Sequence, residues 1–173
     1  MPDPAELPPS REHPRRTVYR GRLVSVLVQE GRYREVVHHP GSCAAVPLID
    51  GDVVLVRQYR DAVDEELLEI PAGTRDVAGE DVAECAAREV TEETGYRVTG
   101  IERLGRIYNS PGFLDEAVNL FLATVEPAGQ GEEAIEVVRM PLSEAVAEVR
   151  EGGILDAKTA VGLLLAADRL LES

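Results

Sequence analysis

The chain has 173 residues, 44% of them hydrophobic, so it is long enough for one ordinary domain with a core and too short for two. It carries 32 acidic against 18 basic residues, a net charge of -14 that repels nucleic acid and anionic membranes, and we expect neither as a partner. No apolar run approaches the ~18–20 residues that span a bilayer, and Cys43 and Cys85 lie among apolar neighbours outside any CxxC pattern, so we expect reduced thiols and a cytoplasmic location.

The first half of the chain is predicted to be a tail followed by strands. Residues 1–16 contain five prolines and mixed charges, which predicts a flexible tail. Asp50-Gly51-Asp52 between two β-branched runs predicts a hairpin. The strands expected here are 17–30 with a break at Gly21, then 33–38, 43–49, 53–59 and 67–70.

The second half mixes helices with strands. A helix is predicted over 81–94, with Gly95 as its C-terminal stop. Ser143 predicts the cap of a helix that runs to about Arg150, and a last, very apolar helix is expected to begin at Asp156 or Lys158 and reach Leu171. Further strands are expected at 98–108, 118–125 and 134–140. This order favours an α+β layered fold over a doubly wound parallel sheet.

The helix predicted over 81–94 carries acids at the border of its apolar side. At about 100° per residue, Glu89, Glu92 and Glu93 share roughly one hundred degrees of its surface. The apolar stripe of alanines and Val90 lies directly beside them. Partly desolvated carboxylates repel one another, and protonation or a bound cation relieves that repulsion. Hard oxygen ligands favour Mg²⁺ or Mn²⁺ over zinc. A solvated acidic face is the plainer interpretation of the two adjacent glutamates taken alone.

The surrounding motif resembles the Nudix box. The matching residues are Glu80, Arg88, Glu89, Val90, Glu92, Glu93, Gly95 and Tyr96. One departure is that Gly73 lies one residue early, with Thr74 at the family position. The resemblance implies a metal-dependent hydrolase of nucleoside diphosphate derivatives, folded as an α/β/α sandwich of mixed β-sheet with flanking helices.

The resemblance also implies roles for these residues. Glu89, Glu93 and the Ala72 carbonyl are the expected principal metal ligands, with Glu92 as a further ligand, direct or through water. Arg88 is expected to orient the glutamates through charge-assisted pairs. Glu80 is expected to bind a metal through water or to hold the loop.

Residues outside the box resemble the ADP-ribose pyrophosphatase group. The similar segments are 19–22, 56–60, 68–73 and 110–113. For this group we expect Arg57 and Arg60 to bind phosphate or stack on adenine, and Glu69 to accept a hydrogen bond from adenine or ribose. Rim salt bridges for the arginines and a surface carboxylate for Glu69 remain open alternatives. The other expected substrate-binding residues are Ser110, Gly112, Phe113 and Glu116.

The same resemblance implies a domain organisation and a partner. Residues 17–40 are expected to form a β-arm that crosses to a second copy in a homodimer, and residues 41–173 to form the hydrolase domain. Arg22 and Arg32 would then act on the substrate of the partner. Glu133, or Glu132 as second choice, is expected to approach the metals once substrate is bound and to help activate water. A solvated acidic loop is the alternative.

The expected reaction is hydrolysis of ADP-ribose to AMP and ribose 5-phosphate. The alternatives are another nucleoside diphosphate sugar as substrate, or a non-catalytic module that binds ADP-ribose. Such a module would be expected to lack some of Glu89, Glu92 and Glu93, which are all present.

Overall fold

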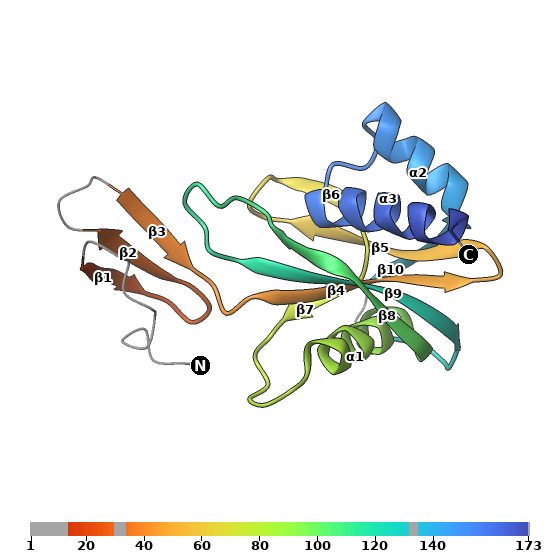
Figure 1. The fold of residues 1–173 in the computed structure, drawn as a ribbon, viewed down its shortest axis with the longest axis horizontal. Helices are drawn as coiled ribbons and strands as arrows, with labels where there is room; N and C mark the ends of the chain where they lie inside the picture. Colours follow the sequence, from red (N-terminus) through yellow and green to blue (C-terminus); the bar gives the residue numbers. More distant parts are fainter. Residues whose placement is uncertain (1–13, 30–33, 132–134, 173) are drawn as a thin grey trace.

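The computed structural model describes residues 14–29, 34–131 and 135–172 (Figure 1). The chain begins with a three-stranded antiparallel sheet in which the strand predicted over 17–30 is divided in two near Gly21. Figure 1 shows this sheet projecting from the rest of the protein. The first strand starts inside the segment predicted as a tail. The three strands are β1 (Arg15–Arg20), β2 (Ser25–Gln29) and β3 (Arg34–His38).

A seven-stranded mixed sheet forms the centre of the main body. Its main path runs β10-β5-β4-β9-β8, with β6 on β5 and β7 on β4. The predicted hairpin is confirmed, because Asp50 (φ 53°) and Gly51 (φ 86°) both have the positive φ of a tight turn between β4 and β5. The strands are β4 (Ser42–Ile49), β5 (Asp52–Arg60), β6 (Glu65–Glu69), β7 (Ala72–Thr74), β8 (Tyr96–Tyr108), β9 (Ala117–Pro127) and β10 (Glu136–Pro141).

Strand β4 is the central strand and is buried on both faces. It runs parallel to β9 and antiparallel to β5 and β7. Successive side chains of a strand point to opposite faces. Cys43 and Ala45 accordingly pack in the cluster under α1 (Val82–Thr94), and Ala44 and Val46 pack in the cluster under the two other helices. The sheet therefore lies between two helical layers, which confirms the predicted α/β/α arrangement.

The second helical layer consists of α2 (Leu142–Glu151) and α3 (Ala157–Leu171). Asp156 caps α3, accepting a hydrogen bond from the Thr159 backbone N–H. The predicted cap of α2 was wrong. Its N-cap is Pro141, with no side-chain cap, and Ser143 lies inside the first turn. A side-chain cap is not needed at Leu142, because its backbone N–H donates to the Gly51 carbonyl at 3.1 Å.

The two cysteines are joined, which corrects the expectation of reduced thiols. A disulfide links Cys43 of β4 to Cys85 of α1, with their Cα atoms 6.2 Å apart. The pairing follows from the packing of α1 on β4 across 42 residues of sequence, which local sequence patterns do not show. Within the described residues, none of the helices is long and apolar enough to cross a membrane.

Candidate active site

The acidic helix α1 has strong local signals at both ends. Asp81 accepts a hydrogen bond from the Ala83 N–H at 2.8 Å, and the Glu84 side chain reaches back to the Asp81 N–H at 3.3 Å. This reciprocal capping box fixes where the helix begins. Gly95 ends it in the left-handed conformation (φ 72°), as predicted. The helix start and end thus fix the positions of the glutamates along the edge of the sheet.

Glu89 and Glu93 are both buried, with 8% and 5% of their surfaces exposed. The Glu89 carboxyl lies against the backbone of Gly73 in β7, where an added Cβ would be 1.9 Å from the Glu89 Cδ. Only glycine leaves room for this carboxylate. Gly73, although it lies one residue early in the motif, therefore provides the space for the Glu89 carboxylate of α1.

Glu93 connects α1 to two strands. Its Oε2 accepts a hydrogen bond from the Ala72 N–H at 3.2 Å, and its Oε1 accepts one from Gln58 Nε2 at 3.1 Å. These two contacts hold the Glu93 carboxylate between β5 and β7. Gln58 of β5 was not among the predicted site residues, since its position beside the helix depends on the packing of β5.

Arg88 lies among three glutamates. It pairs with Glu80 at 2.9 Å, with Glu89 at 2.7 Å and with Glu92 at 2.8 Å. The hydrogen bonds that Arg88 donates to Glu80 and the charges of Glu89 and Glu92 raise the pKa of Arg88, although burial acts in the opposite direction. Arg88 thus remains a permanent cation in contact with all three carboxylates, and its orienting role stays a prediction.

The donor chemistry of this cluster fits a hard divalent cation. Carboxylate oxygens lie on one edge of α1, beside a glycine that leaves space for them. Over residues 14–29, 34–131 and 135–172, no three His, Cys, Asp or Glu side chains form a ready-made metal cage. The Arg88 guanidinium supplies the positive charge among the carboxylates of Glu80, Glu89 and Glu92.

A cavity of about 420 Å³ adjoins the cluster and is lined by Ala72 and Gly73. Glu69 also lines this cavity; it is 1% exposed and accepts two hydrogen bonds from Arg60, both at 2.7 Å. Lys158 of α3 also donates to Glu69 and pairs with Asp156 at 2.9 Å. Burial raises the pKa of Glu69, but the hydrogen bonds and charges of Arg60 and Lys158 outweigh it and leave that pKa lowered.

A second predicted residue, Glu116, also lines this cavity. It accepts hydrogen bonds from the Ser42 hydroxyl and from Asn109 Nδ2, the latter at 3.0 Å. The cavity therefore brings together Arg60, Glu69, Glu116 and Ala72 from the predicted set.

Sequence reasoning missed several residues of this cavity. Lys158 and Asp156 were considered only as the start of α3. A lysine two residues after a capping aspartate was the available signal, because a buried lysine needs an acidic partner. Ser42 and Asn109 carried no signal of their own. The cavity residues absent from the predicted site include the polar His39, Ser42, Asn109, Asp156 and Lys158 and the apolar Leu23, Ala62, Val63 and Leu67.

Other predicted residues lie elsewhere. Arg57 pairs with Glu136 of β10 at 3.2 Å and does not line the cavity. Gly112 and Phe113 line a separate hollow of about 240 Å³ beside the N-terminal sheet. The Ser110 carbonyl accepts the turn hydrogen bond from the Phe113 N–H at 3.2 Å. Arg22 is exposed in the turn between β1 and β2. Arg32, Glu132 and Glu133 lie outside the described residues.

The family model of the NUDIX domain matches residues 38–158. The chain belongs to the Nudix family. Among similar proteins, an ADP-ribose pyrophosphatase of Bacillus subtilis is 32% identical, covering 84% of this chain and 86% of that protein. A GDP-mannose pyrophosphatase of Cronobacter sakazakii is 40% identical, covering 74% of each chain. A crystal structure of an ADP compounds hydrolase has a TM-score of 0.77 at 24% identity, covering 91% of this chain and 92% of the other, and shows the fold.

Nudix hydrolases in general require a divalent metal ion, which agrees with the carboxylate chemistry at Gly73. The enzyme class predicted from the motif is therefore confirmed, as is the mixed sheet between helices.

Proposed function

We propose that this protein hydrolyses the diphosphate bond of ADP-ribose to give AMP and ribose 5-phosphate. The observation that carries the proposal is the cavity at Ala72 and Gly73, which joins the buried carboxylates Glu89 and Glu93 to the Arg60–Glu69 pair. A diphosphate bound there would place its anionic centre beside the carboxylate cluster and one organic end beside Arg60.

Mg²⁺ is the proposed cofactor, with Mn²⁺ as the alternative. Glu89, Glu93 and the Ala72 carbonyl would hold it, Glu92 would add a ligand, and Glu80 would act through water. The metal supplies neutralisation of the diphosphate oxygens and lowers the pKa of an attacking water. The chain's own contribution is the fixed position of the carboxylates, because Arg88 ties three of them to one guanidinium.

The Arg60–Glu69 pair is suited to hold the nucleoside. The two parallel hydrogen bonds fix the plane of the guanidinium, whose side chain is still 42% exposed. A fixed and exposed guanidinium plane can stack on an adenine face. Glu69 and Lys158 then serve to hold that plane, and Glu116, which lines the same cavity, is the residue proposed to contact the sugar end.

A loop glutamate is proposed to activate or orient the attacking water. The assignment to Glu133, with Glu132 as second choice, is supported by the residues before and after it. A Cβ on Gly131 would lie 2.8 Å from the Glu92 carbonyl, so the loop begins against the end of α1. After it, Glu136 pairs with Arg57 of β5.

A homodimer is proposed, in which residues 17–40 act as the arm. The N-terminal sheet is bonded to the body through Val37, whose N–H donates to the Phe113 carbonyl at 2.7 Å. The arm keeps Val18, Tyr19 and Leu23 about half exposed, at 46%, 57% and 45%. In the dimer Arg22 and Arg32 would reach the substrate of the partner. A stable monomer in light scattering at micromolar concentration would contradict this.

The second candidate substrate is a nucleoside diphosphate sugar such as GDP-mannose, which is favoured by the 40% identity to a GDP-mannose pyrophosphatase. The deciding experiment is product analysis over a panel of nucleoside diphosphate derivatives, with and without Mg²⁺. Preferred release of AMP from ADP-ribose supports the proposal, and preferred release of GMP supports the second candidate. Binding of ADP-ribose without any turnover would indicate the non-catalytic module.

We also propose a cytoplasmic location. Because the structure pairs Cys43 with Cys85, fractionation of cells combined with thiol alkylation would test both the location and the state of the cysteines.

A further inference from the structure

A third hollow, of about 260 Å³, is distinct from the active-site cavity and from the hollow at Phe113. It lies on the face of the sheet that α1 covers, beyond the first turn of that helix. Val82 of α1, Arg75 of the preceding loop, Arg106 of β8 and Asn119 of β9 line it. It shares only His39 with the lining of the active-site cavity. No part of the proposed hydrolysis uses it.

A β-bulge in β8 turns Arg106 toward this hollow. Arg103 pairs with Phe121 and Arg106 with Asn119, with a register shift between them. Phe121 packs in the cluster under α1, so its cross-strand partner and Arg106 share that face. The Arg106 guanidinium lies 5.2 Å from the centre of the Tyr108 ring, a cation–π contact that holds it against the strand.

Arg75 reaches the same hollow from the other side. Its N–H donates to the Gly41 carbonyl at 3.1 Å, and its Cδ would lie 3.9 Å from a Cβ placed on Gly41. The charge of Arg75 acts through space on Glu80, whose carboxylate is hydrogen-bonded to Arg88.

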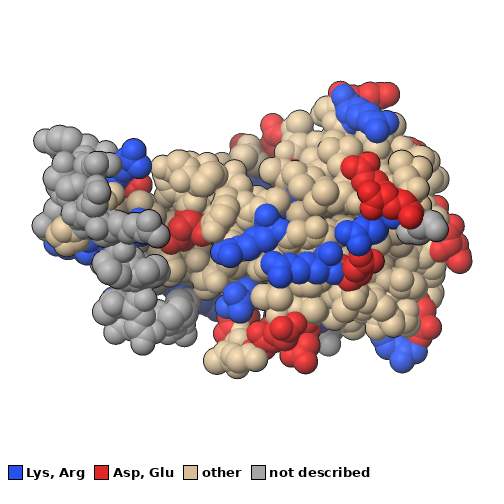
Figure 2. All heavy atoms as spheres, in the orientation of Figure 1, with Lys and Arg blue, Asp and Glu red and all other residues tan. Residues whose placement is uncertain are grey.

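Neither Arg75 nor Arg106 forms a salt bridge with another described residue, although the chain carries 32 acidic residues. The carboxylate in the lining, Asp115, is already engaged: Oδ2 accepts from His38 at 2.8 Å and Oδ1 from the His39 N–H at 2.9 Å. Figure 2 shows Lys and Arg side chains gathered across the middle of this view, over the position of β8 in Figure 1.

Two histidines line the hollow, of which His38 is hydrogen-bonded to Asp115 and His39 lies beside Gly41. Burial lowers the pKa of His39, against the opposing charges of Glu116 and Asp115. Its Nδ1 accepts from the Gly41 N–H at 3.1 Å, so the neutral ring carries its proton on Nε2. The hollow therefore combines two guanidinium groups with one carboxylate, Asp115, that is already hydrogen-bonded.

We propose that this hollow is a binding site for a phosphate group, either free or carried by a phosphate monoester. Two guanidinium forks that approach from separate elements match the oxygens of a tetrahedral dianion. The hollow is larger than one phosphate, which leaves room for part of a sugar. The inference goes beyond the proposed hydrolysis and does not depend on it.

Calorimetric titration of the full chain in EDTA with inorganic phosphate tests the proposal. Without divalent metal the carboxylates around Gly73 repel phosphate, so binding reports the hollow. We expect saturable binding that weakens at least about tenfold in Arg106→Met and in Arg75→Met. Arg106→Lys should lose part of the affinity, because it keeps the charge and loses the fork.

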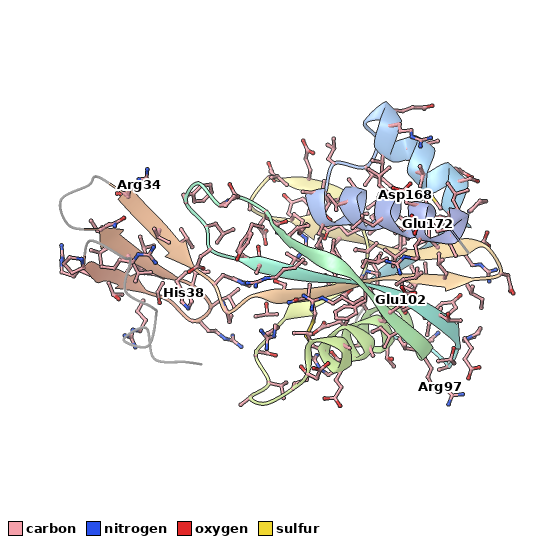
Figure 3. All side chains as sticks on the ribbon, in the orientation of Figure 1. Arg34, His38, Arg97, Glu102, Asp168 and Glu172 are labelled. Atoms are coloured by element: carbon pink, nitrogen blue, oxygen red, sulfur yellow. A yellow bond between two sulfur atoms is a disulfide. The ribbon has the colours of Figure 1, made fainter. Side chains whose placement is uncertain are left out.

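Arg97→Met is the matched control. Arg97 is also on β8 but pairs with Glu126. Figure 3 shows its side chain pointing away from the protein, at the end of β8 that is far from His38. It should bind phosphate like the unaltered protein, and all variants should keep their melting temperature. The proposal is overturned if the unaltered protein shows no saturable binding, if Arg97→Met weakens binding as much as Arg106→Met, or if both hollow variants bind normally.

Titrations with AMP, ribose 5-phosphate and adenosine identify the carrier. Binding of either monoester with the same dependence on both arginines supports a phosphate carried by an organic group. If AMP and ribose 5-phosphate bind no more tightly than inorganic phosphate, the free ion is the supported ligand. Adenosine binding as tightly as AMP would show that the phosphate is not recognised and would overturn the proposal.

Discussion

The carboxyl of Glu89 occupies the space that a side chain at Gly73 would need, with the Glu89 Cδ only 1.9 Å from the position of such a Cβ. The acidic helix and strand β7 are thus fitted to each other at one glycine. Changes on either side of this contact should alter the site without dismantling the fold.

The first prediction concerns that glycine. Gly73→Ala should displace Glu89 and lower kcat at least about 30-fold, or about 2 kcal/mol, with a weaker dependence on added metal. Steady-state hydrolysis across a metal titration measures it. Gly100→Ala is the control, because a Cβ there meets only Thr124 at 3.7 Å. Unchanged kinetics in Gly73→Ala would mean that Glu89 is not held by this contact.

The second prediction concerns charge at the metal site. Glu93→Gln keeps the shape but removes one charge and turns an amide toward one of its two donors, Ala72 N–H or Gln58 Nε2. We expect kcat to fall by at least about two orders of magnitude, about 2.7 kcal/mol, with the fold intact. Glu144→Gln, an exposed position on α2, controls for net charge. Near-normal turnover at saturating Mg²⁺ would refute the ligand assignment.

The third prediction separates the two loop glutamates. Glu133→Gln should lower kcat strongly and leave KM and metal affinity nearly unchanged, because the interaction forms on the way to the transition state. Glu132→Gln should lower kcat less than Glu133→Gln does. Steady-state hydrolysis of ADP-ribose by both variants across pH measures this. Wild-type kcat in Glu133→Gln, or a crippled Glu132→Gln, would contradict the assignment.

The fourth prediction concerns the disulfide between β4 and α1. It closes a loop with a sequence separation of 42, so its reduction should lower the free energy of unfolding by about 3–4 kcal/mol through the entropy of the unfolded chain. Denaturant unfolding with and without reductant measures the change. The double variant Cys43→Ala, Cys85→Ala should not respond to reductant. An equal response in that variant would exclude the disulfide as the cause.

The fifth prediction concerns acid stability. Burial raises the pKa of Glu69, but Arg60 and Lys158 outweigh it, so the folded pKa lies below the ordinary value of 4.5. The ionised carboxylate therefore stabilises the fold above about pH 4.5, and this stability is lost as pH falls through the folded pKa.

Glu69→Gln should flatten the pH dependence of unfolding in that acid range. At neutral pH it should lower stability by up to about 3 kcal/mol, because Lys158 stays buried without this partner. Glu66→Gln, exposed on the same strand, is the control. Unfolding curves from pH 3 to 7 compare them, and an unchanged acid slope in Glu69→Gln would show that the pair does not set it.

The features predicted well from sequence are those fixed by neighbouring residues. The hairpin at Asp50-Gly51 depends on two positive φ angles, and the ends of α1 depend on Asp81 and Gly95. The carboxylates at the edge of the helix followed from its periodicity, and the Nudix family followed from the resemblance of the residues at 80–96 to its motif.

The features that escaped prediction depend on contacts across the fold. The Cys43–Cys85 bond and the pairing of Lys158 with Glu69 join residues that are 42 and 89 positions apart. Pro141 replaced the expected cap because the Gly51 carbonyl, far away in sequence, satisfies the first N–H of α2. No local pattern contains this information.

The position of β4 also has a consequence for how the protein is made. This strand pairs in parallel with β9, so that Ser42 lies beside Val118 and Leu48 beside Thr124. Because parallel strands from distant segments close late and slowly, a nascent chain that ends at α1 has the complete acidic helix and the antiparallel partners β5 and β7 of its central strand, but not the parallel partner β9. We expect the native sheet to form only after β9 has left the ribosome, and an exposed edge of β4 until then.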